Sequence, residues 1–197
     1  MKNSGAMPDS LYEHLNPTGT QPSVLYGLAK VDKPTVNNMT KLRPILSAIN
    51  SPTYKLSQYM NQLLKPFTTS QYTAKDSFSF AVDISKQDPS HYMSSLDVDS
   101  LFTNIPLNET VKICSSLLFH DKPIVDGLTK NEFEQLLTIA TTESLILFND
   151  NYYQQIDGVA MGSPLGPTLA NVFLCHHEQQ WLDTAPNSKT SLLQALR

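Results

Sequence analysis

The sequence predicts an α+β fold in which helices pack beside short antiparallel hairpins. Residues 24–29 and 41–46 are two short strand-forming runs joined by a polar stretch, which is typical of a hairpin. Residues 145–156 repeat this pattern around a turn that begins at Asn149. A capping box at Thr129–Glu132 precedes apolar residues at helical spacing, so the chain mixes helices with hairpins.

The composition is that of a soluble globular chain. The 197 residues are 40% hydrophobic and 16% charged, which suits one well-cored domain or part of a larger one. The sequence has no apolar run long enough to cross a bilayer and no charged-then-apolar leader. We therefore expect an intracellular protein that is not secreted and has no membrane partner.

The charge is distributed unevenly along the chain. The net charge of −4 by itself argues against a nucleic-acid binder. Residues 1–66, however, carry seven Lys/Arg against three Asp/Glu, while residues 67–197 carry seven against fifteen. A basic leading segment followed by an acidic remainder suits a protein that holds phosphates and cations in different places, although an ordinary domain can show it by chance.

The first hairpin carries one basic residue at each strand. Residues 1–23 are rich in glycine, proline and polar residues, which predicts a flexible lead-in. In the hairpin that follows, Lys30 and Arg43 can point to one face, and an arginine fork suits phosphate because it donates two parallel hydrogen bonds. The alternative is a hairpin with ordinary solvated charges.

Two helices are expected next. Ser51-Pro52-Thr53 is a start signal for a helix over residues 54–64, which has apolar residues at helical spacing and ends before Pro66. A weaker helical pattern covers residues 77–85.

The stretch of residues 94–106 is predicted to be a buried strand that runs into a turn, with a carboxylate, Asp97, at the end of the strand. A buried acid is costly unless a metal ion or an arginine pairs with it, so we interpret Asp97 as a metal ligand. The alternative is that Asp97 only caps the following turn, and Asp99 is interpreted as a turn or surface acid.

The second half of the chain alternates helices with a hairpin and a glycine loop. Asn108 or a neighbour caps a helix to about Phe119, and the capping-box helix follows with Phe133, Leu136, Leu137 and Ala140 on its buried face. After the hairpin of residues 145–148 and 152–156, a Gly/Pro loop opens a helix over about residues 167–182.

The cysteines and histidines do not predict a metal site. Cys114 and Cys175 fall in predicted helices and are interpreted as reduced core residues. The run Cys175-His176-His177-Glu178 contains ligand types, but adjacent residues on a helix point in different directions.

Four stretches together resemble the motifs of reverse transcriptases. They are residues 25–30 (LYGLAK), 42–47 (LRPILS), 94–106 (SSLDVDSLFTNIP) and 158–171 (GVAMGSPLGPTLAN), and they occur in the family's order. The amino-acid sequences of residues 101–106 and 161–167 resemble those of the Penelope-like retroelement branch. The resemblance implies a right-hand polymerase with fingers at about 24–90 and a partial palm at about 91–184, and leaves 185–197 as a tail outside the family.

The resemblance also implies roles for individual residues. Asp97 and the Val98 carbonyl would hold Mg²⁺ (or Mn²⁺) for two-metal nucleotidyl transfer. Arg43, with Lys30 nearby, would bind the triphosphate of the incoming nucleotide. Phe102, five residues after Asp97, falls at the steric-gate position that excludes a ribose 2′-hydroxyl, although a plain core phenylalanine is the alternative.

The glycine loop is implied to contact the nucleotide and the nucleic acid. Met161 and Gly162 stand where many reverse transcriptases have Gln-Gly, and the methionine fits the Penelope-like branch. Gly162 and Gly166 would let the backbone approach the template base and nascent pair, with Pro167 beside them. A helix-opening turn uses the same residues.

One expected part of the palm is absent from the sequence. The family's next motif is a hairpin with two adjacent aspartates, and no aspartate follows Asp183. Two cations would then face mostly uncompensated repulsion, so metal binding by this chain is doubtful. We expect a reverse transcriptase fragment, without thumb and aspartate-pair hairpin, that does not polymerise alone.

Two other interpretations remain open beside the enzyme. The chain is either a non-catalytic remnant that binds RNA or primer-template, or a functionless translated relic. The resemblance implies an RNA template, a DNA primer and deoxynucleotides as partners and the nucleus as the place of action, and it leaves the oligomeric state open.

Overall fold

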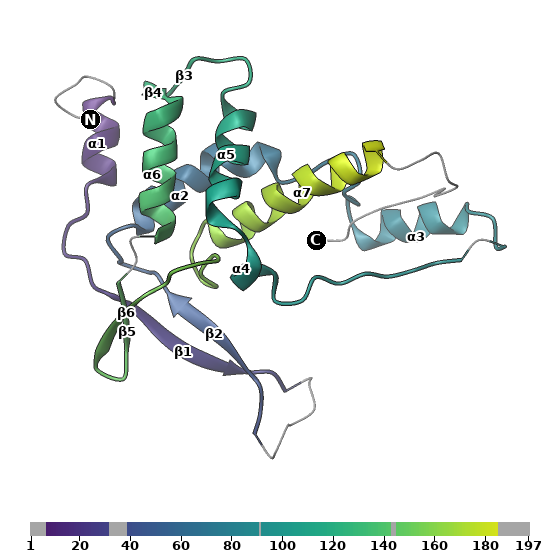
Figure 1. The fold of residues 1–197 in the computed structure, drawn as a ribbon, viewed down its shortest axis with the longest axis horizontal. Helices are drawn as coiled ribbons and strands as arrows, with labels where there is room; N and C mark the ends of the chain where they lie inside the picture. The colour runs from purple at the N-terminus through teal and green to yellow at the C-terminus, as the bar shows by residue number, and fades with distance from the viewer. Residues whose placement is uncertain (1–6, 32–38, 91, 143–144, 185–197) are drawn as a thin grey trace.

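The computed structural model combines helices with two small sheets, as the α+β prediction requires (Figure 1). It describes residues 7–31, 39–90, 92–142 and 145–184. Most of the predicted lead-in is described, and it contains a short helix, α1 (Asp9–Leu15), with no buried residue. The predicted tail, residues 185–197, lies outside the described residues.

The larger sheet has four strands in the order β2-β1-β5-β6. Its first hairpin pairs β1 (Ser23–Ala29) with β2 (Leu42–Ser47) in antiparallel register, and this confirms the predicted hairpin. The second hairpin pairs β5 (Leu145–Phe148) with β6 (Asn151–Gln154), and β5 runs parallel to β1. Hairpins far apart in sequence therefore form one sheet.

The β5–β6 turn has the chemistry that the sequence predicts. Asn149 and Asp150 have φ values of 48° and 59°, and two successive residues with positive φ give a tight turn whose twist matches that of the strands. Asn and Asp tolerate this left-handed region better than most residues. The second strand, however, ends at Gln154, so Gln155 and Ile156 lie outside it.

The helices form a layer beside the sheet, except α3, which lies apart at one end of the molecule (Figure 1). Their bounds are α2 (Tyr54–Leu64), η2 (Lys65–Phe67), α3 (Ser77–Ser85), α4 (Leu101–Asn104), α5 (Leu107–Leu118), α6 (Lys130–Thr142) and α7 (Gly166–Thr184). A two-stranded sheet of β3 (Ile124–Val125) and β4 (Leu128–Thr129) connects α5 to α6. Among the described helices, none is long and apolar enough to cross a membrane.

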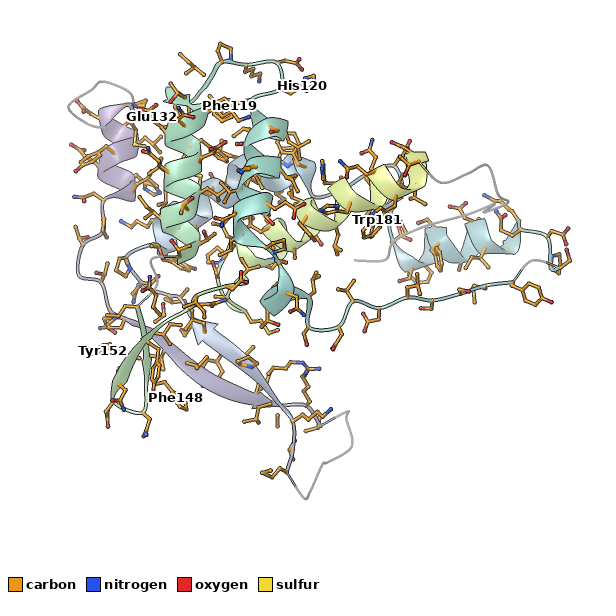
Figure 2. All side chains as sticks on the ribbon, viewed as in Figure 1. Phe119, His120, Glu132, Phe148, Tyr152 and Trp181 are labelled. Atoms are coloured by element: carbon orange, nitrogen blue, oxygen red, sulfur yellow. The ribbon has the colours of Figure 1, made fainter. Side chains whose placement is uncertain are left out.

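The core lies where α2, α5, α6 and α7 meet. Figure 2 shows side chains from these helices filling the space between them. The fully buried residues include Met60, Leu64, Ile105, Cys114, Phe133, Leu137, Leu165, Leu169 and Val172. Helical spacing in the sequence predicted the buried faces of α2, α5, α6 and α7, whereas Ile105 and Leu165 lie outside the helices and were not predicted.

The start of α6 is fixed by the predicted capping box. The backbone N–H of Thr129 donates to Glu132 Oε2 at 2.9 Å, and the Thr129 hydroxyl donates to the same oxygen at 2.7 Å. The Glu132 N–H donates back to Thr129 Oγ1 at 3.4 Å. For α5, where Asn108 or a neighbour was the expected cap, the N-cap is Pro106, and Asn108 lies inside the helix.

The prediction of a buried strand ending at Asp97 is wrong. Residues 92–98 are extended but belong to no strand, and all of them are exposed, with Leu96 at 95% and Val98 at 50%. The segment runs as a single line between α3 and α4 (Figure 1). A strand needs a neighbour to pair its backbone groups, and no described strand lies beside these residues, so the apolar pattern alone does not bury them.

Candidate functional site

A glycine-rich loop, residues 158–166, lies between α4 and strand β2. At its start, the Val159 N–H donates to the carbonyl oxygen of Phe102 at 2.7 Å. Gly158 has φ +72°, and a Cβ there would lie 2.7 Å from the Thr103 carbonyl oxygen. Only glycine fits this approach, so the loop packs directly against the backbone of α4.

The middle of the loop is joined to β2. The Leu46 N–H donates to the carbonyl oxygen of Met161 at 2.7 Å. Gly162 has φ +113°, and a Cβ at this position would collide with the carbonyl oxygen of Leu46. In this structure Gly162 therefore allows close approach of protein backbone, whereas the sequence suggested close approach of a nucleic-acid base.

The end of the loop forms the first turn of α7. A Cβ on Gly166 would lie 2.9 Å from the Ala160 carbonyl oxygen and 3.5 Å from the ring of Phe102. The ring of Phe102 thus sits against the helix start, partly buried at the edge of the core. This contact brings together two motifs that are about 60 residues apart in the sequence.

The loop, α4 and α2 enclose an open pocket of roughly 630 Å³. Four predicted site residues line it together, namely Phe102, Met161, Gly162 and Pro167. The remaining lining residues are Ile49, Tyr54, Gln58, Asn61, Ser163 and Pro164. A ring, a thioether and side-chain amides around one cavity can hold a planar heterocycle by apolar contact and hydrogen bonds.

Among the lining residues that the sequence reasoning missed, three belong to α2. Tyr54, Gln58 and Asn61 lie on one side of α2, at the spacing i, i+4, i+7. The Thr168 hydroxyl on α7 donates to Asn61 Oδ1, which fixes the orientation of that amide. The available signal was the presence of side-chain amides within an otherwise core-forming helix.

Lys30 and Arg43 share one face of the first hairpin, as predicted. Leu28 pairs with Arg43, and the Lys30 N–H donates to the Lys41 carbonyl oxygen at 2.8 Å, which continues the same register. Residues two apart on a strand point to the same side, so Lys30, Lys41 and Arg43 all face one way. Neither Lys30 nor Arg43 lines the pocket described above.

Asp97 and Val98 lie outside the pocket, in the exposed extended segment. Among the described residues, no three His, Cys, Asp or Glu side chains come together as a metal-binding group. One exposed carboxylate and one backbone carbonyl are too few oxygen ligands for Mg²⁺, so the described residues do not by themselves fit a catalytic ion. Asp99 lies in the turn before α4, as expected, where the Ser100 hydroxyl donates to it at 3.2 Å.

The histidines of α7 contact protein groups. His177 Nε2 lies 3.1 Å from Glu109 Oε1 on α5, and the His177 ring lies 4.4 Å from that of Phe173. His176 Nε2 lies 2.9 Å from the side-chain amide nitrogen of Gln180. Burial, followed by the neighbouring His177, lowers the pKa of His176, which therefore favours its neutral form.

Comparison with known proteins places these motifs in a family. A search of curated proteins finds no match. The family model described as reverse transcriptase (RNA-dependent DNA polymerase) matches residues 31–193, which is most of the chain and includes Phe102, the glycine loop and α7. The chain therefore belongs to the reverse transcriptase family.

Proposed function

We propose that the chain is the fingers and part of the palm of a right-hand, RNA-directed DNA polymerase from the Penelope-like branch. Family membership implies binding of a nucleic-acid template and primer. The branch assignment is supported by the sequences LFTNIP at residues 101–106 and MGSPLGP at residues 161–167. The observation that carries the proposal is that these two motifs line one pocket.

In this proposal the pocket receives the incoming deoxynucleotide. Phe102 packs against the sugar, and its ring blocks the space that a ribose 2′-hydroxyl needs. Met161 and Gly162 contact the nucleotide from the loop, while Gly166 and Pro167 face the template and primer. Arg43, with Lys30, approaches the triphosphate from the hairpin, which is held to the loop by the Leu46–Met161 hydrogen bond.

Catalysis requires more than this chain supplies. In the complete enzyme, Asp97 and the Val98 carbonyl are proposed to hold Mg²⁺ or Mn²⁺ together with further carboxylates. The bound ions would supply activation of the primer hydroxyl and stabilisation of the leaving phosphate. Because Asp97 and the Val98 carbonyl are too few oxygen ligands for Mg²⁺ and no three His, Cys, Asp or Glu side chains gather among the described residues, we expect no polymerisation by this chain alone, and nuclear action only as part of the complete element.

Nucleotide binding by the purified chain tests the pocket. We expect saturable photo-crosslinking of a deoxynucleoside triphosphate and weaker crosslinking of the matching ribonucleotide. Phe102→Val should reduce this preference. Phe148→Val, a matched change on the sheet outside the pocket, should leave the preference as in wild type. Equal crosslinking of both sugars by wild type would contradict the steric-gate role.

Primer extension tests the activity. With an RNA template, a DNA primer and Mg²⁺, the purified chain should give no product, whereas a longer product of the same element with an aspartate-pair hairpin should extend the primer. Asp97→Ala should abolish that extension. Primer extension by the chain alone would contradict the expected need for further carboxylates. Activity that survives in Asp97→Ala would show that Asp97 is not a catalytic residue.

The binding remnant is the second candidate, and the uneven charge favours it. The fingers segment carries the basic excess, which can hold phosphates without chemistry. Affinity for primer-template that barely changes from low to moderate salt would rule out this phosphate-dominated binding. A hydrogen-exchange profile without a protected core would instead favour the functionless relic.

A further inference from the structure

We propose that His177 on α7 and Glu109 on α5 form a pH-dependent contact, in which a protonated His177 ring between two aromatic rings holds α7 against α5. The contact joins the second half of α7 to the first turn of α5. The first half of α7 supplies Leu169 to the core and Pro167 to the pocket. The contact therefore acts on the helix that supports the pocket, from a place outside it.

The His177 ring lies in a column of rings along one side of α7. Phe173, His177 and Trp181 are spaced i, i+4, i+8, which places them one above another on the helix. The centroid of the His177 ring lies 4.4 Å from that of Phe173 and 5.7 Å from that of Trp181. The face of an aromatic ring attracts a cation within about 6 Å of its centroid. Both neighbours lie within this distance, so they favour the charged form of the imidazole.

The contact with Glu109 also suits a charged ring better than a neutral one. His177 Nε2 lies 3.1 Å from Glu109 Oε1, but the two groups are not aligned as a hydrogen bond, and this buried nitrogen has no hydrogen-bond partner among the described residues. A hydrogen bond weakens steeply when it is misaligned, whereas the Coulomb attraction between two charges depends on their distance. Protonation of the ring would therefore strengthen a contact that gives a neutral ring little.

Burial distinguishes this pair from an ordinary surface pair. The side chain of His177 is 18% exposed and that of Glu109 51%, so the charges are partly shielded from water while a proton can still exchange with it. The chain has a second pair of the same kind, His120 and Asp121, in which the side chains are 79% and 84% exposed. Solvated pairs contribute little to stability, so His120 and Asp121 provide an internal comparison.

Two titratable groups face the His177 ring. Glu109 does so from α5, and His176 does so from α7 itself, with its ring centroid 5.3 Å away. Burial, and then His177, lowers the pKa of His176, so His176 stays neutral and leaves the proton to His177. The other charged residues of α7, of the elements packed against it and of the loop that contacts its end are Glu178, Asp183, Lys112, Lys55, Lys65, Lys75 and Asp76. In the described part of the chain, none of these carboxylates forms an ion pair with His177.

Proton uptake changes the strength of the contact. Imidazole changes its charge near neutral pH, where a carboxylate stays ionised. As the pH falls, His177 takes one proton from water, its charge changes from zero to +1, and the contact with Glu109 becomes an ion pair. As the pH rises, the proton returns to water and the attraction is lost. The contact between α5 and α7 is therefore stronger in mild acid than in alkali.

The fluorescence of Trp181 tests this directly. The chain has one tryptophan, so its emission reports on the ring next to His177. A protonated imidazole quenches indole emission more than a neutral one does, so the emission of the purified chain should fall in one step as the pH decreases from about pH 8 to pH 5. His177→Gln should abolish this step. Glu109→Gln, which removes only the negative charge, should move its midpoint to lower pH by roughly half a unit.

Two matched controls accompany these variants. His176→Gln removes the adjacent histidine of the same helix and should retain the step, because His176 stays neutral. Asp121→Asn removes the carboxylate beside His120, which lies away from Trp181 (Figure 2), and should leave the midpoint as in wild type. Urea midpoints at about pH 8, where an imidazole is mostly neutral, should match wild type in every variant and confirm that each one is folded.

The energetic coupling between the two residues gives a second measurement. A double-mutant cycle of Glu109→Gln and His177→Gln, by urea denaturation, should show coupling at about pH 5.5 that disappears at about pH 8. Because the half-exposed Glu109 tolerates an amide, Glu109→Gln remains informative even if His177→Gln does not fold.

Four results would overturn the inference: no change in wild-type emission, a step that survives in folded His177→Gln, equal midpoints in wild type and Glu109→Gln, or a step lost in folded His176→Gln. None of the substituted residues lines the nucleotide pocket, and no nucleotide or metal ion is present. Failure of nucleotide crosslinking would therefore leave this inference intact, and failure of the fluorescence step would leave the proposed function intact.

Discussion

The backbone N–H of Leu46 donates a hydrogen bond to the carbonyl oxygen of Met161 at 2.7 Å. Leu46 lies on β2, three residues after Arg43, and Met161 lies in the glycine loop beside the pocket. The bond therefore fixes the basic hairpin to the pocket wall. A displacement of the hairpin should therefore move the glycine loop, and a displacement of the loop should move the hairpin.

Gly162→Ala should break this junction. The new Cβ would collide with the Leu46 carbonyl oxygen, and φ +113° is strained for any residue with a Cβ. We expect a loss of at least about 2 kcal/mol in the free energy of unfolding, measured by urea denaturation. Weaker nucleotide crosslinking should accompany it, because the loop lines the pocket.

Gly19→Ala is the control for this prediction. Gly19 also has positive φ, +62°, but a Cβ there meets nothing within 4 Å. Gly19→Ala should lower the free energy of unfolding by only about 1 kcal/mol, from backbone strain alone. Equal costs for the two variants would mean that the contact between Gly162 and Leu46 does not hold the loop.

The sequence predicted the parts of the fold that local chemistry determines. The capping box at Thr129, the Asn149 turn and the helical spacing in α2 all act between residues close in the chain, and the structure confirms each of them. Of the pocket, the sequence predicted the part formed by Phe102 and the glycine loop, because these belong to recognisable motifs.

The failures concern contacts between distant segments. The segment that leads to Asp97 was expected to be a buried strand, but no described strand pairs with it, so Asp97 lies in an exposed segment. Nothing local to α2 indicates that Asn61 would meet Thr168, about 100 residues later. Periodicity states which face of an element is apolar, not which other element will cover it.

The hydrogen bond made by Tyr59 should make the folded protein less stable at alkaline pH. Its hydroxyl donates to Asp126 Oδ2 at 3.1 Å, and burial, with the nearby carboxylate, raises the pKa of Tyr59 well above its usual value. Because the pKa of Tyr59 is higher in the folded state than in the unfolded state, the protonated hydroxyl stabilises the fold fully below pH 10. This stabilisation is lost as the pH rises from 10 through the folded-state pKa. Tyr59→Phe should therefore cost about 1 kcal/mol at pH 7, for the lost hydrogen bond.

Urea denaturation of both proteins from pH 8 to pH 11.5 checks this. The difference in unfolding free energy between wild type and Tyr59→Phe should narrow as pH rises above 10. Tyr153→Phe, on the sheet away from Asp126, serves as the control and should follow wild type throughout. A constant difference across the range would show that the Tyr59 contact makes no pH-dependent contribution.

The hydrogen bonds to Glu132 should make the folded protein less stable at acidic pH. Hydrogen bonds from the Thr129 backbone N–H, and then from its hydroxyl, hold the pKa of Glu132 below its usual value of 4.5. A lowered folded pKa contributes stability above pH 4.5 that is lost as pH falls through the folded pKa. Glu132→Gln should be less stable than wild type at pH 6 and approach it below pH 4.5, by thermal unfolding. A gap that widens in acid would contradict the capping role.

Cys114 provides a chemical test of the core. It is fully buried in α5, and burial raises the pKa of its thiol to about 12, so almost no reactive thiolate exists at pH 8. In a Cys175→Ser background, Cys114 should react with a disulfide reagent only as the protein unfolds, so its rate should rise with urea in step with global unfolding. A cysteine placed by Ser116→Cys, exposed two residues further along α5, should react within seconds without urea. Rapid native labelling of Cys114 would mean that α5 and α7 separate readily and that the core supporting the pocket is loose.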